Sequence, residues 1–142
     1  MLQDRQPDSD TILVVDDEPS IRTALCEVLQ RTKHPVMAVR DGQEALVLLE
    51  RQPIWLIVAD LRMPRMGGVE LFARLEDTRP ALASRVLFLS GDISQLAEPG
   101  NTPVSRERVL VKPVELAELE RRILEFIRGR ENEGVRGTGP EV

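Results

Sequence analysis

Short apolar runs separated by amphipathic stretches constrain the fold of this chain most. The runs have the length of buried strands, and apolar residues recur at helical spacing between them. They occupy residues 12–15, 36–39, 54–59, 86–89 and 109–111. Strands that alternate with helices are typical of a parallel sheet covered by helices on both faces. The pattern therefore predicts an α/β fold with a doubly wound, five-stranded parallel sheet.

The stretches between the strands carry signals for where helices begin. Pro19 suits the first turn of a helix, and Asp41 and Glu44 resemble a capping box in front of a second one. The Gly67-Gly68 pair frees the backbone for a turn before a third helix. Residues 93–105 contain Pro99, Gly100 and Pro103, so the fourth helix is predicted to be short or irregular.

Length and composition favour a single folded unit. With 142 residues, 42% of them hydrophobic, the chain is long enough to bury one core. Residues 1–9 and 129–142 are polar and rich in glycine, proline or charge, which predicts disordered tails. The folded unit is predicted to span residues 10–128, and the second tail is too short to form another domain.

Charge and hydropathy exclude several classes of function. The net charge of −5 and the pI of 5.0 argue against direct binding of nucleic acid, which usually needs a basic face. The apolar runs are too short to span a membrane and no leader segment precedes them, so we expect a cytoplasmic protein without membrane insertion. The single cysteine, Cys26, has no partner for an internal disulfide.

Polar residues follow the predicted strands directly. Asp16 and Asp17 come after the first strand, Asp60 after the third and Ser90 after the fourth, while Lys112 follows the fifth. In a doubly wound sheet, ligands bind outside the carboxyl ends of the strands at the switch point in strand order. We therefore expect these side chains to share one edge of the sheet.

These residue types suit the transfer of a phosphoryl group to an aspartate. Three carboxylates can surround one Mg²⁺, and a carboxylate beside a metal can attack phosphorus. Asp60 is the predicted nucleophile, with Ser90 donating a hydrogen bond to one phosphoryl oxygen and Lys112 holding another. Each residue taken alone has a simpler structural explanation. The acid pair also suits a helix N-terminus, Ser90 a turn and Lys112 a solvated surface.

Jointly, these residues resemble the response-regulator receiver family over roughly residues 10–128. The separations from Asp60 to Ser90 and from Ser90 to Lys112 both match the family's spacing. The resemblance implies a flavodoxin-like sheet with strand order 2-1-3-4-5. It also implies that Asp16 and Asp17 bind Mg²⁺, that Asp60 accepts the phosphoryl group, that Ser90 is the switch hydroxyl and that Lys112 is the family's invariant lysine.

The resemblance assigns further roles around the acceptor. The main-chain carbonyl of Arg62 would be a metal ligand, and Pro113 would follow a cis peptide bond. Arg62, Gly91 and Asp92 would tune the lifetime of the phosphorylated state. The chain departs from the family at Val109, where an aromatic switch residue is common. We therefore expect Ser90 to act through an order–disorder change of residues 91–105.

The resulting hypothesis is a stand-alone receiver of a two-component phosphorelay. It accepts a phosphoryl group from a histidine kinase or phosphotransfer protein and then changes its affinity for a downstream protein partner. It is a signalling switch rather than an enzyme, since it catalyses only its own phosphorylation and dephosphorylation. Alternatives are a receiver cut from a hybrid kinase or longer regulator, a constitutive pseudo-receiver, and a hydrolase of the haloacid-dehalogenase type. The last places its nucleophile in an Asp-x-Asp pattern, which Asp16-Asp17-Glu18 lacks.

Overall fold

The computed structural model describes residues 10–31, 33–61, 63, 65–90, 108–111, 117–125 and 128. Its elements are, in chain order, β1 (Ile12–Val15), α1 (Pro19–Gln30), β2 (Val36–Val39), α2 (Gly42–Leu49), β3 (Leu56–Asp60), α3 (Gly68–Thr78), α4 (Pro80–Ala83), β4 (Val86–Ser90) and β5 (Val109–Val111). Residues 117–125 are also helical. The five strands occupy the positions that the apolar runs predict, to within two residues.

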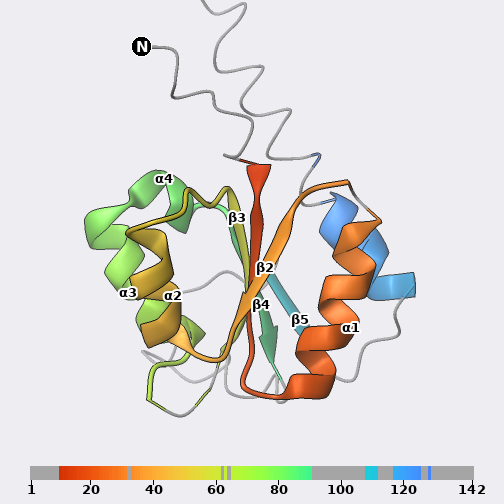
Figure 1. Cartoon of the computed structure of the whole chain (residues 1–142), viewed down its shortest axis with the longest axis horizontal. Helices are drawn as coiled ribbons and strands as arrows, with labels where there is room; N and C mark the ends of the chain where they lie inside the picture. Colours follow the sequence, from red (N-terminus) through yellow and green to blue (C-terminus); the bar gives the residue numbers. More distant parts are fainter. Residues whose placement is uncertain are drawn as a thin grey trace, which may run out of the picture.

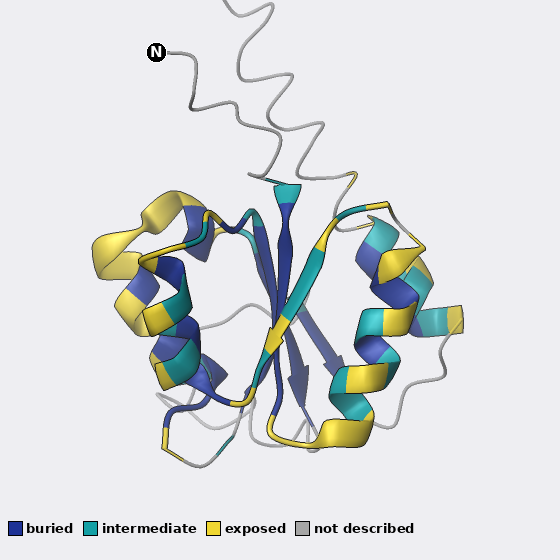
Figure 2. Cartoon of the chain, in the orientation of Figure 1, coloured by how far each residue is buried: buried dark blue, intermediate teal, exposed yellow. Residues whose placement is uncertain are grey.

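The strands form one parallel sheet in the order β2-β1-β3-β4-β5. Figure 1 shows α2, α3 and α4 on one side of the sheet, and α1 with the helix at residues 117–125 on the other. Strands β1, β3 and β4 are buried along their whole length, whereas β2 at the edge is mostly half-buried (Figure 2). The predicted doubly wound, flavodoxin-like fold is confirmed.

Two hydrophobic cores lie on the two faces of the sheet. Leu13 and Ile57 belong to the core beneath α2 and α3, while their neighbours Ile12 and Leu56 belong to the core beneath α1 and residues 117–125. Side chains alternate between faces along a strand, so burial on both faces requires the continuous apolar runs of the sequence. Each fully buried leucine or isoleucine contributes about 1.5–3 kcal/mol.

The helix starts follow the sequence signals with one difference. Pro19 lies in the first turn of α1, and the Asp41 side chain caps α2 by accepting the Glu44 backbone N–H at 3.0 Å. The Glu44 carboxylate accepts the backbone N–H of Arg40, at 2.9 Å, in place of the Asp41 N–H that a capping box requires. The cause is the Arg40 guanidinium, which binds the same carboxylate and draws it one residue further back.

Two local features differ from the sequence-based expectations. Among the described residues of the turn before α3, the left-handed one is Arg65, with φ 71°, whereas Gly67 is the N-cap at φ −89°. A short helix that the apolar pattern does not predict follows α3: Pro80 opens the four-residue α4, because proline fits the first turn of a helix. The predicted tails and the predicted fourth helix at residues 93–105 lie outside the described residues. Within the described part, every helix is too short or too polar to cross a membrane.

Candidate functional site

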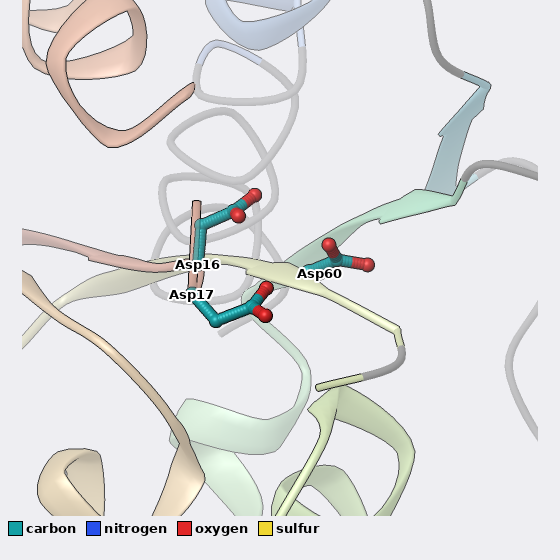
Figure 3. Close-up of side chains that lie close together, drawn as sticks. All are labelled: Asp16, Asp17 and Asp60. Carbon is teal, nitrogen blue, oxygen red and sulfur yellow. The ribbon is translucent and has the colours of Figure 1, made fainter. Parts of the chain in front are cut away.

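Three carboxylates meet at the carboxyl ends of two neighbouring strands. Asp16 and Asp17 follow β1, and Asp60 is the last residue of β3, which pairs with β1 in parallel register with Val15 opposite Ala59. One carboxylate oxygen of each acid lies within 4.8 Å of those of the other two. Figure 3 shows the three side chains extending from the two strand ends into the same region. The sequence-based expectation that these acids converge is correct.

The burial of these acids gives the cluster its chemistry. Asp16 is fully buried and Asp60 nearly so, while Asp17 is exposed. Carboxylates held this close repel one another, and a cation between them removes the repulsion. An all-oxygen donor set of this kind fits a hard divalent ion such as Mg²⁺, with water completing the coordination sphere. The exposed side at Asp17 leaves the buried pair accessible to an ion from solvent.

The first turns of α1 hold Asp16 in place. The backbone N–H of Glu18 donates to Asp16 Oδ1 at 3.0 Å, and Arg22 Nη1 donates to the main-chain oxygen of Asp16 at 2.8 Å. Arg22 was missed by sequence reasoning. The signal that points to it is a cationic residue one turn into the helix that directly follows the acid pair.

Ser90 lies at the same edge of the sheet, one strand beyond Asp60. It ends β4, and the register places Leu89 opposite Asp60, with the Leu61 N–H donating to the Leu89 carbonyl at 2.8 Å. Ser90 is buried and pairs with Val111, the last residue of β5. Lys112 follows Val111 in the chain, but Lys112, Pro113, Arg62, Gly91 and Asp92 all lie outside the described residues.

The start of α3 packs directly on the backbone of Asp60. A Cβ atom on Gly68 would lie 2.5 Å from the main-chain oxygen of Asp60 and 3.2 Å from Cδ1 of Phe88. A glycine is therefore required here by close approach rather than by an unusual dihedral angle. The backbone N–H of the preceding residue, Gly67, donates to the Glu70 carboxylate at 3.0 Å, which fixes the first turn of the helix.

Val109 stands at the position where the resemblance predicts an aromatic switch residue. It is buried opposite Phe88 in the β4–β5 register.

The preceding residue, Arg108, contacts the same aromatic side chain. Its guanidinium lies over the rings of Phe72 and Phe88, at 5.1 and 5.9 Å from their centroids. The expected response of residues 91–105 concerns a segment outside the described residues.

A doubly wound parallel sheet with three carboxylates at its switch point places this chain in the class of α/β proteins that bind ligands at the carboxyl ends of their strands. The family model "Response regulator receiver domain" matches residues 12–124. The chain therefore belongs to the response regulator receiver family. Receiver domains are signalling switches of two-component systems, and they bind Mg²⁺ at this acidic cluster. Membership of this family overturns the alternative of a haloacid-dehalogenase-type hydrolase.

Individual relatives agree with the family assignment. The response regulator receiver protein CpdR of Brucella abortus is 29% identical over 108 residues, covering 76% of this chain and 88% of CpdR. The alkaline phosphatase synthesis transcriptional regulatory protein PhoP of Bacillus subtilis is 31% identical over 120 residues, covering 84% of this chain. The match spans 49% of the length of PhoP, and 18% of the length of the transcriptional regulatory protein GlrR of Escherichia coli.

Among solved structures, the chemotaxis response regulator CheY4 of Vibrio cholerae superposes with a TM-score of 0.71. It is 26% identical in sequence, and the match covers 82% of this chain and 98% of CheY4. The shared region is thus the whole receiver fold.

Proposed function

We propose that this receiver domain accepts a phosphoryl group on Asp60 from the phosphohistidine of a histidine kinase or of a phosphotransfer protein. The observation that carries the proposal is the cluster of three carboxylates within 4.8 Å at the ends of β1 and β3. Asp16, Asp17 and Asp60 would hold Mg²⁺, together with the main-chain carbonyl of Arg62. Their oxygen ligands and partial burial support this assignment.

The chemistry divides among the residues of the cluster. When bound, Mg²⁺ offsets the repulsion between anions and stabilises the charge that grows on the transferred oxygens. A carboxylate oxygen of Asp60 attacks phosphorus, and the bond from phosphorus to the donor's imidazole nitrogen breaks, leaving its electron pair on the imidazole. Ser90 would donate a hydrogen bond to one phosphoryl oxygen, and Lys112 would bind another through its ammonium group.

The consequence of phosphorylation would be a change in affinity for a downstream protein partner. The side chains of Arg62 and Asp92 and the small Gly91 would set how long the phosphoryl group persists, and Pro113 would follow a cis peptide bond. Turnover would be limited to the domain's own phosphorylation and dephosphorylation, as befits a switch. PhoP and GlrR are named transcriptional regulatory proteins, but the match to this chain covers only 49% and 18% of their lengths. We therefore do not assign direct contact with nucleic acid to the receiver.

Intact-protein mass spectrometry tests the proposal. The wild type and the variants Asp60→Asn and Asp77→Asn are incubated with a small phosphodonor, with and without Mg²⁺. Asp77 is an exposed aspartate of α3 and serves as the matched control. We expect the wild type and Asp77→Asn to gain one phosphoryl group only with Mg²⁺, and Asp60→Asn to gain none. No gain by the wild type would refute the proposal and leave a constitutive pseudo-receiver. An equal gain by Asp60→Asn would refute the assignment of the acceptor.

A further inference from the structure

The segment between β3 and α3 contains a residue in a conformation that costs free energy. Arg65 has φ 71°, in the left-handed region that side chains other than glycine rarely adopt. Such a conformation persists only where the surrounding structure holds it, and it is common next to functional sites. Arg65 lies five residues after Asp60, in the segment that connects the proposed acceptor to α3.

A buried carboxylate on α2 holds Arg65. Arg65 Nε donates to Asp41 Oδ2 at 2.9 Å, and Arg65 Nη2 donates to the same oxygen. The Asp41 side chain is 2% exposed, while that of Arg65 is 56% exposed. The other oxygen, Oδ1, accepts the N–H of Glu44 and caps α2. One carboxylate thus joins the start of α2 to the segment after β3. The pKa of Asp41 is lowered by the Glu44 N–H and, to a lesser degree, by the Arg65 guanidinium.

A backbone contact reinforces this junction. The N–H of Gly42 donates to the Met66 carbonyl at 2.9 Å, and a Cβ on Gly42 would lie 2.7 Å from Met66 Cγ. The backbones of α2 and the segment therefore touch at residues 42 and 66. This contact brings Arg65 within reach of Asp41, and the ion pair in turn keeps the two backbones together.

The segment is also tied to the sheet at its other end. The Leu61 N–H donates to the Leu89 carbonyl at 2.8 Å, and α3 begins at Gly68 in direct contact with the Asp60 carbonyl. A displacement of residues 65–67 would therefore move the group that packs on the Asp60 main chain.

We propose that Asp41 and Arg65 form a positioning pair for the phosphorylation site, holding residues 65–68 so that Asp60 keeps the geometry needed to bind Mg²⁺. The inference rests on the proposed function and extends it to residues that do not touch the reacting atoms. Partners that orient metal ligands in this way typically change metal affinity by about 10- to 100-fold when they are removed. Because the contact acts through backbone packing, we expect the lower end of that range.

Four variants separate the pair from other effects. Asp41→Asn keeps an oxygen that can cap α2 and removes the charge. Arg65→Ala removes the pair and leaves an unfavourable dihedral angle, whereas Arg65→Gly removes the pair and relieves the angle. Arg40→Ala is the control. It deletes an exposed ion pair with Glu44 at the same end of α2 and leaves Asp41 and Arg65 in place.

The readouts are the Mg²⁺ dissociation constant from calorimetry, the rate of phosphorylation by a small phosphodonor, and the free energy of unfolding without Mg²⁺. We expect the dissociation constant to rise about tenfold in Asp41→Asn, Arg65→Ala and Arg65→Gly, and to be unchanged in Arg40→Ala. The Arg65→Gly variant is decisive. If it bound Mg²⁺ with the same dissociation constant as the wild type, the backbone angle and not the pair would position the site.

Two contrary outcomes are distinguishable. If the wild type binds Mg²⁺ and the three pair variants bind it equally well while unfolding more easily, the pair is structural only and the positioning role is wrong. If the wild type itself neither binds Mg²⁺ nor accepts a phosphoryl group, the proposed function fails and the positioning role fails with it.

Discussion

Replacing Gly68 with alanine should destabilise the domain and slow its phosphorylation. The added Cβ would lie 2.5 Å from the Asp60 main-chain oxygen and 3.2 Å from the Phe88 ring. The nearer atom belongs to the backbone of a buried strand, so it cannot turn away as a flexible side chain would. Forcing an extra carbon into a packed site typically costs about 1–3 kcal/mol.

An opposing effect reduces the net cost. Alanine is favoured over glycine in a helix by about 0.5–1 kcal/mol. Because Gly68 is the first residue of α3, only part of this gain applies, and the expected loss of unfolding free energy is about 1–2 kcal/mol. The strain that remains is expected to displace Asp60 from its place beside Asp16 and Asp17. The rate of phosphorylation by a small phosphodonor should fall together with stability.

Urea unfolding followed by the fluorescence of Trp55, the single tryptophan, measures this effect. Trp55 precedes β3 at the end of the sheet opposite Asp60, so its signal reports unfolding rather than local changes at the site. The control is Asp77→Ala on the exposed face of α3, which should change stability by less than about 0.5 kcal/mol. A Gly68→Ala variant as stable as the wild type would refute the close approach.

Three further measurements test other parts of the structure. Lys33 has a left-handed backbone like Arg65, with φ 68°, so replacing it with glycine should raise the free energy of unfolding by about 0.5–1 kcal/mol. Unchanged or lower stability in urea would contradict this. Arg22→Ala should weaken Mg²⁺ binding about tenfold, because it removes a donor to the Asp16 main chain, and calorimetry that shows equal affinity would exclude the role. The pKa of Asp41 is lowered in the folded state. The ionised Asp41 therefore stabilises the fold fully at pH values above about 4, the usual pKa of an aspartate. This stabilisation is lost as the pH falls from there through the lower pKa of the folded state. Below about pH 4 the wild type should therefore lose stability more steeply than Asp41→Asn, and parallel curves would contradict this.

The fold was predictable because its signals are local and repeat along the chain. Strands buried on both faces require continuous apolar runs, and the helices between them need one apolar stripe each. The meeting of Asp16, Asp17 and Asp60 followed from geometry, since the carboxyl ends of parallel strands share one edge. The sequence positions alone were enough to place them together.

Features set by tertiary contacts were not predictable in this way. The Gly67-Gly68 pair suggested where an unusual backbone angle would lie, but the left-handed angle is at Arg65. The Arg65 side chain binds the Asp41 carboxylate, and the next residue, Met66, accepts the Gly42 N–H. Neither contact has a signal in the local sequence, because Asp41 precedes Arg65 by 24 positions.

His34 shows the same limit in a different place. Its place in the polar stretch between α1 and β2 gives no signal of a packed side chain. Its side chain is 14% exposed and stacks on Trp55, with ring centroids 5.3 Å apart and planes at 5°. The partner comes from the residues before β3, so only the assembled sheet brings the two rings together.

The identity of the phosphorylated residue tests the central claim most directly. After reaction with a phosphodonor and Mg²⁺, an aspartyl phosphate can be reduced with borohydride to a stable alcohol, and peptide mass spectrometry then locates the altered side chain. The account predicts reduction at Asp60 alone, with Asp16 and Asp17 unchanged. Reduction at Asp16 or Asp17 with an unaltered Asp60 would contradict it.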